Sequence, residues 1–328
     1  MTGLVAIAAL LALSGCEKDA QSTRAPNGTR SSAATGPSTS PTPSTPPATP
    51  APGALGYHLL ASQPVPVDIQ GTALLGDHAA YVEDERRLVW MSWRTGERRT
   101  VYRSVYGSLF MLDNSGRYQF LVDELPSPAG DDPSSPRLYV ELDMLIGRVT
   151  VADYPPHARV VGELNDARIE IERAVRPDGQ ESWRSDLVLV DQQPDPDVPR
   201  RPVTSTGLVV EAAYDRRHRV VWTERHGIRI PDPQRLWTED LFKPGAGPHL
   251  LLDDPDVVPY DPIVGNGYVG WSDNGQHLAL MPLSGGPVTR VSGRVATATW
   301  PVADGPVVAA VLRHGGRNQL LVFRLRVG

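Results

Sequence analysis

The feature that most constrains the fold is the succession of short apolar runs in residues 57–328. These runs are rich in Val, Leu, Tyr and Trp, and turns rich in Gly, Asp, Asn and Pro separate them. No segment shows the apolar spacing of a long amphipathic helix. Many short strands bounded by such turns are typical of an all-β sandwich, barrel or propeller. We therefore predict an all-β fold for this part of the chain.

A unit of short strands and tight turns recurs along these residues, most clearly over 268–291. First strands are expected near Gly71, Gly107, Arg159, Gly207, Pro262 and Arg294. Their mean spacing is close to one propeller blade, about 40–50 residues. Six four-stranded units fit, so the sequence predicts a six-bladed β-propeller, with two β-sandwiches as the alternative.

The last of these units supplies three strands, expected at 294–300, 306–313 and 318–325. Its fourth strand is predicted to come from residues 57–67, far away in the sequence. Such a closure joins the two ends of the propeller and removes an open sheet edge, which would otherwise invite pairing with another chain.

One segment resembles a known repeat. Trp271-Ser272-Asp273-Asn274-Gly275 is similar to the Trp-Ser-Pro-Asp-Gly motif of TolB-like propellers, which are related in architecture to WD40-like repeats. The Pro is missing, because Asn274 directly follows Asp273. The resemblance implies a propeller architecture over residues 57–328 and no particular biochemical role.

The N-terminus begins with an uncharged apolar run over residues 3–13. It is too short to span a bilayer, which takes about 20 residues, and it has the length of a signal-peptide core. Leu13-Ser14-Gly15-Cys16 resembles the lipobox of bacterial lipoproteins. The resemblance implies that residues 1–15 are a signal peptide and that Cys16, the single cysteine, carries diacylglycerol after cleavage.

Residues 1–3 depart from the pattern, because they lack the Lys or Arg expected at the start of a signal peptide. The alternative is a buried N-terminal strand or helix with an incidental Cys16. Residues 16–56 form the second expected region, a disordered linker rich in Pro, Ser and Thr that cannot bury enough apolar surface to order itself. The predicted location is extracytoplasmic, with the chain anchored to the cell membrane by lipid.

Composition narrows the classes of function. The chain carries 32 Lys and Arg against 38 Asp and Glu, a net charge of −6, and no basic stripe. Nucleic acid is therefore not an expected partner, because binding phosphates needs clustered cations. No nucleophile elbow, phosphate-binding loop or metal-protease motif is present. No catalytic, cofactor or metal residues are assigned, and the sequence leaves enzymatic activity open while favouring none.

Three groups of side chains are candidates for a ligand-binding site. The acidic loops at 131–132, 195–197 and 253–256 offer oxygen ligands for Ca²⁺, although none has the spacing of a known calcium loop. His218 and His226 lie in an Arg-rich stretch, which is interpreted either as an anion site or as a charged, exposed blade edge. The seven Trp residues are expected mostly in the core, with a sugar site as the alternative.

The function that these features favour is a lipid-anchored binding or scaffold module for a protein or envelope ligand. Its partners are then the membrane, through Cys16, and an extracytoplasmic ligand, and the chain is expected to be a monomer. The segments 123–136, 174–185 and 191–202 are candidate contact loops. The alternative is an extracytoplasmic enzyme or cofactor-binding propeller with its site at the central channel.

Overall fold

The computed structural model describes residues 55–104, 107–114, 119–126, 138–152, 158–164, 167–175, 181–191, 200–227, 233–243, 245, 247–296, 299, 301–314 and 316–326. All regular secondary structure within these ranges is β-strand, and no helix there could cross a membrane. Cys16 and the linker up to residue 54 lie outside the described residues. The described strands belong to one compact unit, Thr49–Gly328.

Five sheets have four strands each, and in each sheet the strands pair antiparallel in the order of the sequence. The first sheet consists of β2 (Ile69–Leu75), β3 (His78–Glu83), β4 (Arg87–Ser92) and β5 (Arg98–Arg103). The second consists of β6 (Gly107–Asn114), β7 (Gln119–Pro126), β8 (Leu138–Asp143) and β9 (Arg148–Ala152). The third consists of β10 (Ala158–Leu164), β11 (Ala167–Val175), β12 (Glu181–Asp191) and β13 (Arg201–Pro202).

The next two sheets follow the same order. The fourth consists of β14 (Val209–Tyr214), β15 (Arg219–Arg225), β16 (Pro233–Asp240) and β17 (His249–Asp253). The fifth consists of β18 (Pro259–Gly265), β19 (Tyr268–Asp273), β20 (His277–Pro282) and β21 (Thr289–Arg290).

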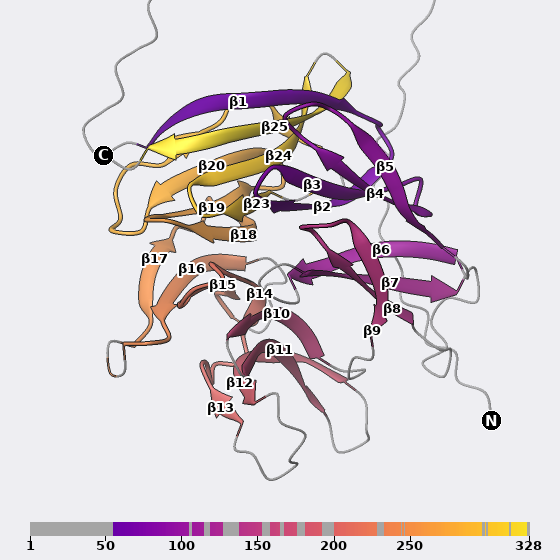
Figure 1. The fold of residues 1–328 in the computed structure, drawn as a ribbon. Coiled ribbons are helices and arrows are strands. Elements are labelled where there is room, and N and C mark those ends of the chain that lie inside the picture. The colour runs from indigo at the N-terminus through magenta and orange to yellow at the C-terminus, as the bar shows by residue number, and fades with distance from the viewer. Residues whose placement is uncertain are drawn as a thin grey trace, which may run out of the picture. The chain divides into compact units, whose positions relative to one another are not determined.

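A closing sheet joins the two ends of this unit. It consists of β1 (Gly56–Val65), β22 (Arg294–Val295), β23 (Val302–Asp304), β24 (Val307–His314) and β25 (Arg317–Arg326). β1 pairs antiparallel with β25, and Figure 1 shows the indigo strand beside the yellow one. The predicted pairing of the 57–67 segment with the last repeat is therefore confirmed.

The innermost strands of the sheets contact one another in a closed ring. The contacts run from β2 to β6, β10, β14, β18 and β23, and from β23 back to β2. A closed ring of antiparallel sheets around a common centre is the arrangement of a β-propeller (Figure 1). The all-β propeller is thus confirmed, and the alternative of two β-sandwiches is excluded.

The expectation of six four-stranded blades needs a correction. Five described sheets have four strands, whereas the closing sheet has five, because its innermost strand is broken into β22 and β23. Six residues separate Val295 from Val302, but only two separate their partners Leu312 and Ala309 on β24. The surplus residues cannot stay in register, so the strand expected over 294–300 ends at Val295 and resumes at Val302.

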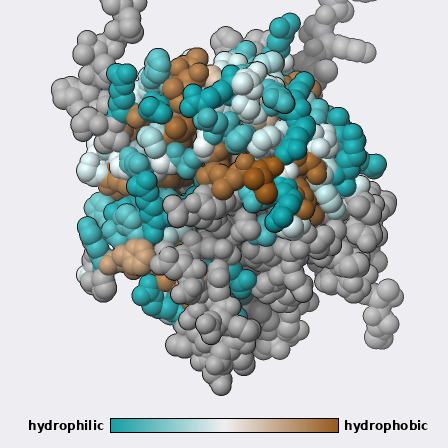
Figure 2. All heavy atoms as spheres, in the orientation of Figure 1, coloured by the Kyte–Doolittle hydropathy of each residue, from teal (hydrophilic) through white to brown (hydrophobic). Residues whose placement is uncertain are grey.

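The hydrophobic core lies between neighbouring sheets. One described cluster joins the first sheet to the closing sheet, with Tyr81, Met91 and Trp93 packed against Val311 and Val322. Similar clusters lie between other neighbouring sheets. The described surface in Figure 2 is mostly hydrophilic, with hydrophobic side chains in separate small groups. Large apolar side chains that remain exposed are Tyr57, Leu59, Val67, Leu145, Ile146, Phe242 and Leu250.

The turns between the first and second strands of the sheets meet at one end of the ring, which we call the turn face. They include residues 76–77, 215–218, 266–267 and 305–306. The backbone N–H of Asn266 donates to the carbonyl oxygen of Gly305 (3.1 Å), and the Gly76 N–H donates to Asp304 Oδ2 (2.7 Å). The described chain also begins at this end, because the Leu325 N–H bonds to the carbonyl oxygen of Pro306 and Gly56 pairs with Arg326.

Candidate functional site

A pocket of about 360 Å³ lies on the first sheet, at its turn-face end. It is lined by His78, Trp90, Ser92, Glu97, Arg98 and Arg99. His78 is paired with Ser92, and Trp90 with Arg99, across strands β3, β4 and β5. Because side chains alternate between the two faces of a sheet, these four residues point the same way, toward the second sheet. The pocket therefore lies on the face of the first sheet that is directed toward the second sheet, and we call it the interblade pocket.

Three stacked side chains form the pocket wall, and Trp90 comes from the middle strand of the three. The rings of His78 and Trp90 are 4.2 Å apart and 19° from parallel. The Arg99 guanidinium carbon lies 4.8 Å from the centre of the Trp90 ring, in a cation–π contact. Such stacking restricts all three side chains, so the wall is formed before any ligand arrives.

The turn between β8 and β9 contacts the stack from the second sheet. Trp90 Nε1–H donates to the carbonyl oxygen of Met144 (2.9 Å), and Arg99 Nη2–H donates to that of Ile146 (2.7 Å). A Cβ on Gly147 would lie 2.6 Å from Arg99 Nη2 and 3.0 Å from Trp90, and Gly147 has φ +63°. Glycine is needed here both for the backbone conformation and for the close approach of the stack.

Replacing Gly147 with Ala is expected to lower the free energy of unfolding by about 1–2 kcal/mol, from left-handed strain together with the clash at Arg99. Gly275→Ala is the matched control, since Gly275 has φ +64° with nothing within 4 Å of an added Cβ. Urea unfolding of both variants checks this. Equal losses would show that the clash with the Trp90–Arg99 stack has no effect.

The lining carries charges of both signs. Arg99 points to the same face of the sheet as Trp90, whereas Arg98 pairs with Met91 and its side chain points to the opposite face, where it interacts with Tyr81. Glu97 is the single carboxylate of the lining. Burial lowers the pKa of His78, and Arg99 lowers it further, while Asp77 opposes both. Asp77 itself is 2.7 Å from Arg94 Nε. The neutral imidazole and the Ser92 hydroxyl add hydrogen-bonding groups without adding charge.

The centre of the turn face holds a second feature, the side chain of Arg216. It extends from the β14–β15 turn, donates to the carbonyl oxygen of Leu74 on β2 (3.1 Å) and lies 3.4 Å from Asp304 Oδ1 on β23. Neither β2 nor β23 neighbours β14 in the ring, so the contact crosses the channel. Only 9% of the Arg216 side chain is exposed, and burial lowers the pKa of its guanidinium while Asp304 raises it.

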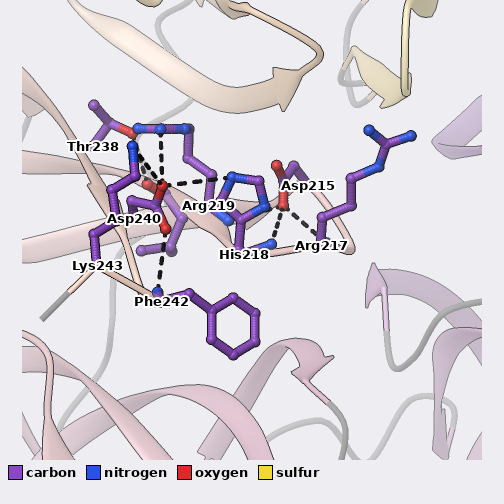
Figure 3. A network of polar contacts seen from close by, with 9 residues as sticks. Asp215, Arg217, His218, Arg219, Thr238, Asp240, Phe242 and Lys243 are labelled. Atoms are coloured by element: carbon purple, nitrogen blue, oxygen red, sulfur yellow. Dashed lines mark hydrogen bonds and ion pairs between the residues drawn. The ribbon is translucent and has the colours of Figure 1, made fainter.

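A third cluster surrounds the buried carboxylate of Asp240 at the end of β16 (Figure 3). Its Oδ2 lies 3.4 Å from Arg219 Nη2, 3.5 Å from His218 Nε2 and 3.9 Å from Lys243 Nζ. The Phe242 backbone N–H donates to Oδ1 (3.2 Å). These interactions tie the β14–β15 turn to the β16–β17 turn, so the cluster stabilises the turn face of the fourth sheet.

The Arg-rich stretch around His218 and His226 forms neither the anion site nor the exposed blade edge that its sequence suggested. β15 is the second strand of its sheet and pairs on both sides, so the exposed-edge interpretation is wrong. Its charges also do not converge, because carboxylates engage the two histidines separately. His226 Nδ1 is 3.8 Å from Asp253 Oδ1, and Asp253 also pairs with Arg235. Arg229 lies outside the described residues.

The acidic loops give no calcium site among the described residues, where no group of three His, Cys, Asp or Glu could hold a metal. Asp254 Oδ1 accepts the Asp256 N–H (2.9 Å), as in a tight turn. The loops at 131–132 and 195–197 lie outside the described residues, as do most of the candidate contact loops 123–136 and 191–202. The third candidate loop, 174–185, is shorter than expected, because β11 extends to Val175 and β12 begins at Glu181. Trp93, Trp222 and Trp271 are buried, which confirms the expectation of core tryptophans for these three.

The Trp271–Gly275 motif forms the end of β19 and the following hairpin turn. Asn274 and Gly275 both have positive φ, 51° and 64°, and the Gln276 N–H bonds to the carbonyl oxygen of Asp273, as in a type I′ turn. Asp273 is buried and its Oδ2 lies 2.7 Å from Arg290 Nε. The motif therefore shapes a blade and does not present its carboxylate to a ligand.

Sequence reasoning missed the pocket and the residues that form it. Trp90 was grouped with the core tryptophans, although it is half-buried and faces a cavity. A usable signal was present, since a cross-strand set of His, Trp, Ser and Arg on one strand face is unusual for a blade core. Arg216 was noticed only as part of a charged stretch, and nothing local in the sequence indicates its partners.

No family model and no curated protein matches this chain. Solved structures with a similar fold include the tricorn protease, 12% identical with a TM-score of 0.49 over 75% of this chain and 24% of that one. They also include the propeller domain of the trilobed protease from Pyrococcus furiosus, 12% identical with a TM-score of 0.46 over 77% and 78%. BamB from Moraxella catarrhalis is 12% identical with a TM-score of 0.39 over 78% and 83%.

The chain spans half of the length of a prolyl endopeptidase that it also matches. All of these similarities are similarities of fold. The described part of the chain is an all-β propeller whose turn face carries an interblade pocket, a channel mouth crossed by Arg216 and the Asp240 cluster.

Proposed function

We propose that this chain is an extracytoplasmic lipoprotein whose propeller is a monomeric binding module. In this proposal residues 1–15 direct export, Cys16 carries the lipid, and the chain from there to residue 54 spaces the propeller from the membrane. Leu55 and Gly56, expected in the linker, already belong to the propeller. The ligand is an envelope component or a protein, and it binds at the turn face. The observation that carries the binding role is the preformed interblade pocket, with its stack of His78, Trp90 and Arg99.

The turn face supports binding in the pocket over chemistry in the channel. Arg216 crosses the channel at this face and is bonded to β2 and β23. A substrate entering from the turn face would have to displace the buried side chain of Arg216 from its partners, and this displacement is costly. The pocket on the first sheet needs no such rearrangement, since its side chains already line an open space.

The lipid anchor is tested by replacing Cys16 with Ala in the full-length gene, expressed in a bacterial host. Wild type is expected in the detergent phase after phase separation, with a diacylglycerol mass on its N-terminal cysteine. Cys16→Ala is expected in the aqueous phase, because a stable anchor needs the acyl chains. If wild type also stays aqueous and unmodified, the membrane part of the proposal fails.

A further inference from the structure

The outer edge of β1 differs from the outer edges of the other sheets. β1 is the outermost strand of the closing sheet, and among the described strands it pairs only with β25. It has ten residues and no Asp, Glu, Lys or Arg. The other outer strands are short or basic: β13 and β21 have two residues each, β9 and β17 have five, and β5 has three Arg among six residues. Short length and charge both discourage pairing with another chain, and β1 has neither.

The open part of this edge is the half of β1 near the turn face. At the other end Pro64 has no N–H to donate, and Gln63 Nε2 donates to a carbonyl oxygen of the β4–β5 turn (2.9 Å). A bulge interrupts the register between Leu59 and Ala61. The four residues Gly56–Leu59 pair with β25 in regular register, and β1 lies on the outside of its sheet (Figure 1). A further strand would therefore find regular backbone along these residues.

One face of this half is apolar. Tyr57 and Leu59 are two residues apart on the strand, so their side chains point to the same face of the sheet. They leave 44% and 51% of their surfaces exposed. The Tyr57 ring lies 5.7 Å from the ring of Phe323, which is buried in the core between the fifth and closing sheets. Apolar side chains of an added strand would extend this core outward.

The opposite face is basic. His58 pairs with Arg324 and Gly56 pairs with Arg326, and the side chains of His58 and both arginines are exposed. Gly56 has no side chain that could stand between Arg326 and the outer edge. Within the described ranges, no ion pair joins either arginine to a carboxylate. Carboxylates on this face of an added strand would therefore meet cations that repel one another.

We propose that the turn-face half of β1 docks an extended segment of a partner protein, in which apolar and acidic residues alternate, as a further strand of the closing sheet. Backbone hydrogen bonds to the edge would give affinity, and the two faces would give specificity. A second copy of this chain would bring the same cations to the shared edge. The preceding linker is rich in Pro, which lacks the N–H that pairing needs. The inference goes beyond the proposed function, because no residue of β1 lines the interblade pocket.

The experiment measures the binding of a labelled Val-Glu-Val-Glu-Val peptide to the full-length Cys16→Ala chain by fluorescence anisotropy. Two control peptides have the same length: Val-Lys-Val-Lys-Val, and the acidic peptide with methylated backbone nitrogens. The acidic peptide is expected to bind saturably. Each control is expected to bind about tenfold more weakly or less, because one reverses the charge and the other cannot donate backbone hydrogen bonds. These controls test the proposal without any change in the chain.

Variants of the chain then locate the site. Leu59→Ser is expected to weaken binding of the acidic peptide by about fivefold, because the peptide no longer covers an apolar side chain. Arg324→Gln is expected to remove most of the preference for the acidic peptide over the lysine peptide. Leu250→Ser is the matched control, since Leu250 is 37% exposed on β17, the outer strand of the fourth sheet. It is expected to bind the acidic peptide like its parent.

Four results would overturn the proposal. They are no binding of the acidic peptide, equal binding of the methylated peptide, equal losses from Leu59→Ser and Leu250→Ser, and a dimer in sedimentation that Leu59→Ser dissociates. The last result would show that a second copy occupies the edge. Loss of ligand binding at the interblade pocket would leave this proposal standing, because the two surfaces share no residue.

Discussion

Removing β1 together with everything before it, by deleting residues 1–66, is expected to abolish cooperative folding of the propeller. β1 pairs with β25 over nine registered residue pairs and buries Val65 in the cluster between the first and closing sheets. Without it, β25 becomes an open edge and that core loses one side. The expected loss is about 5 kcal/mol or more, which is comparable to the whole stability of an ordinary domain.

The matched truncation deletes residues 1–54 and leaves β1 intact. It is expected to unfold in a single transition at the same denaturant concentration as the full-length chain. Circular dichroism and tryptophan fluorescence, followed together through a urea titration, distinguish the two truncated chains. If the shorter chain unfolds as cooperatively as the longer one, the contact between β1 and β25 does not hold the ring closed.

The second large effect is expected from Arg216→Ala. The variant removes the hydrogen bond to Leu74 and leaves the Asp304 carboxylate, 30% exposed, without its cation at the channel mouth. We expect a loss of about 2–3 kcal/mol in the free energy of unfolding. This is less than the loss for a fully buried ion pair, because water screens the partly exposed Asp304. Because Arg216 has φ +61°, an Ala at this position keeps the same backbone strain. The difference in the free energy of unfolding between the two proteins therefore measures the contribution of the Arg216 side chain.

Two further variants sharpen this test. Arg217→Ala, one residue along and exposed, is expected to change stability by less than about 0.5 kcal/mol. Asp304→Asn combined with Arg216→Ala is expected to cost less than the sum of the two single changes, since each single change leaves a partner behind. Strict additivity in the urea titrations would show that the two side chains do not interact across the channel.

The blades were predictable wherever strand and turn signals are local. The turn at Asn274 and Gly275 carries residues that tolerate positive φ, and the hairpin lies where these residues predict it. The turn at Asp84 and Glu85 has the same positive φ without any glycine, so its sequence gives little sign of it. The break between Val295 and Val302 was missed, because register depends on the partner strand, which local patterns do not specify.

The candidate site was less predictable than the fold, since it is assembled from contacts between blades. Arg99 meets Ile146, and Arg216 meets Leu74, across 47 and 142 residues of chain. Neither pairing follows from periodicity or from a spacing motif. The single glycine that permits the pocket wall, Gly147, resembles any other turn glycine until the Trp90 ring is seen beside it.

The strand that closes the ring is also the strand to which the preceding chain is attached. Any tension in that chain passes into β1 at Gly56 before it reaches another sheet, so this attachment and the closure of the ring bear the load in series. A sideways pull would break the β1–β25 hydrogen bonds one after another from the Gly56–Arg326 end. A pull along the strand would be shared by all nine pairs. The resistance of the propeller to a pull on that chain is therefore set by one strand pair, and it depends on the direction of the force.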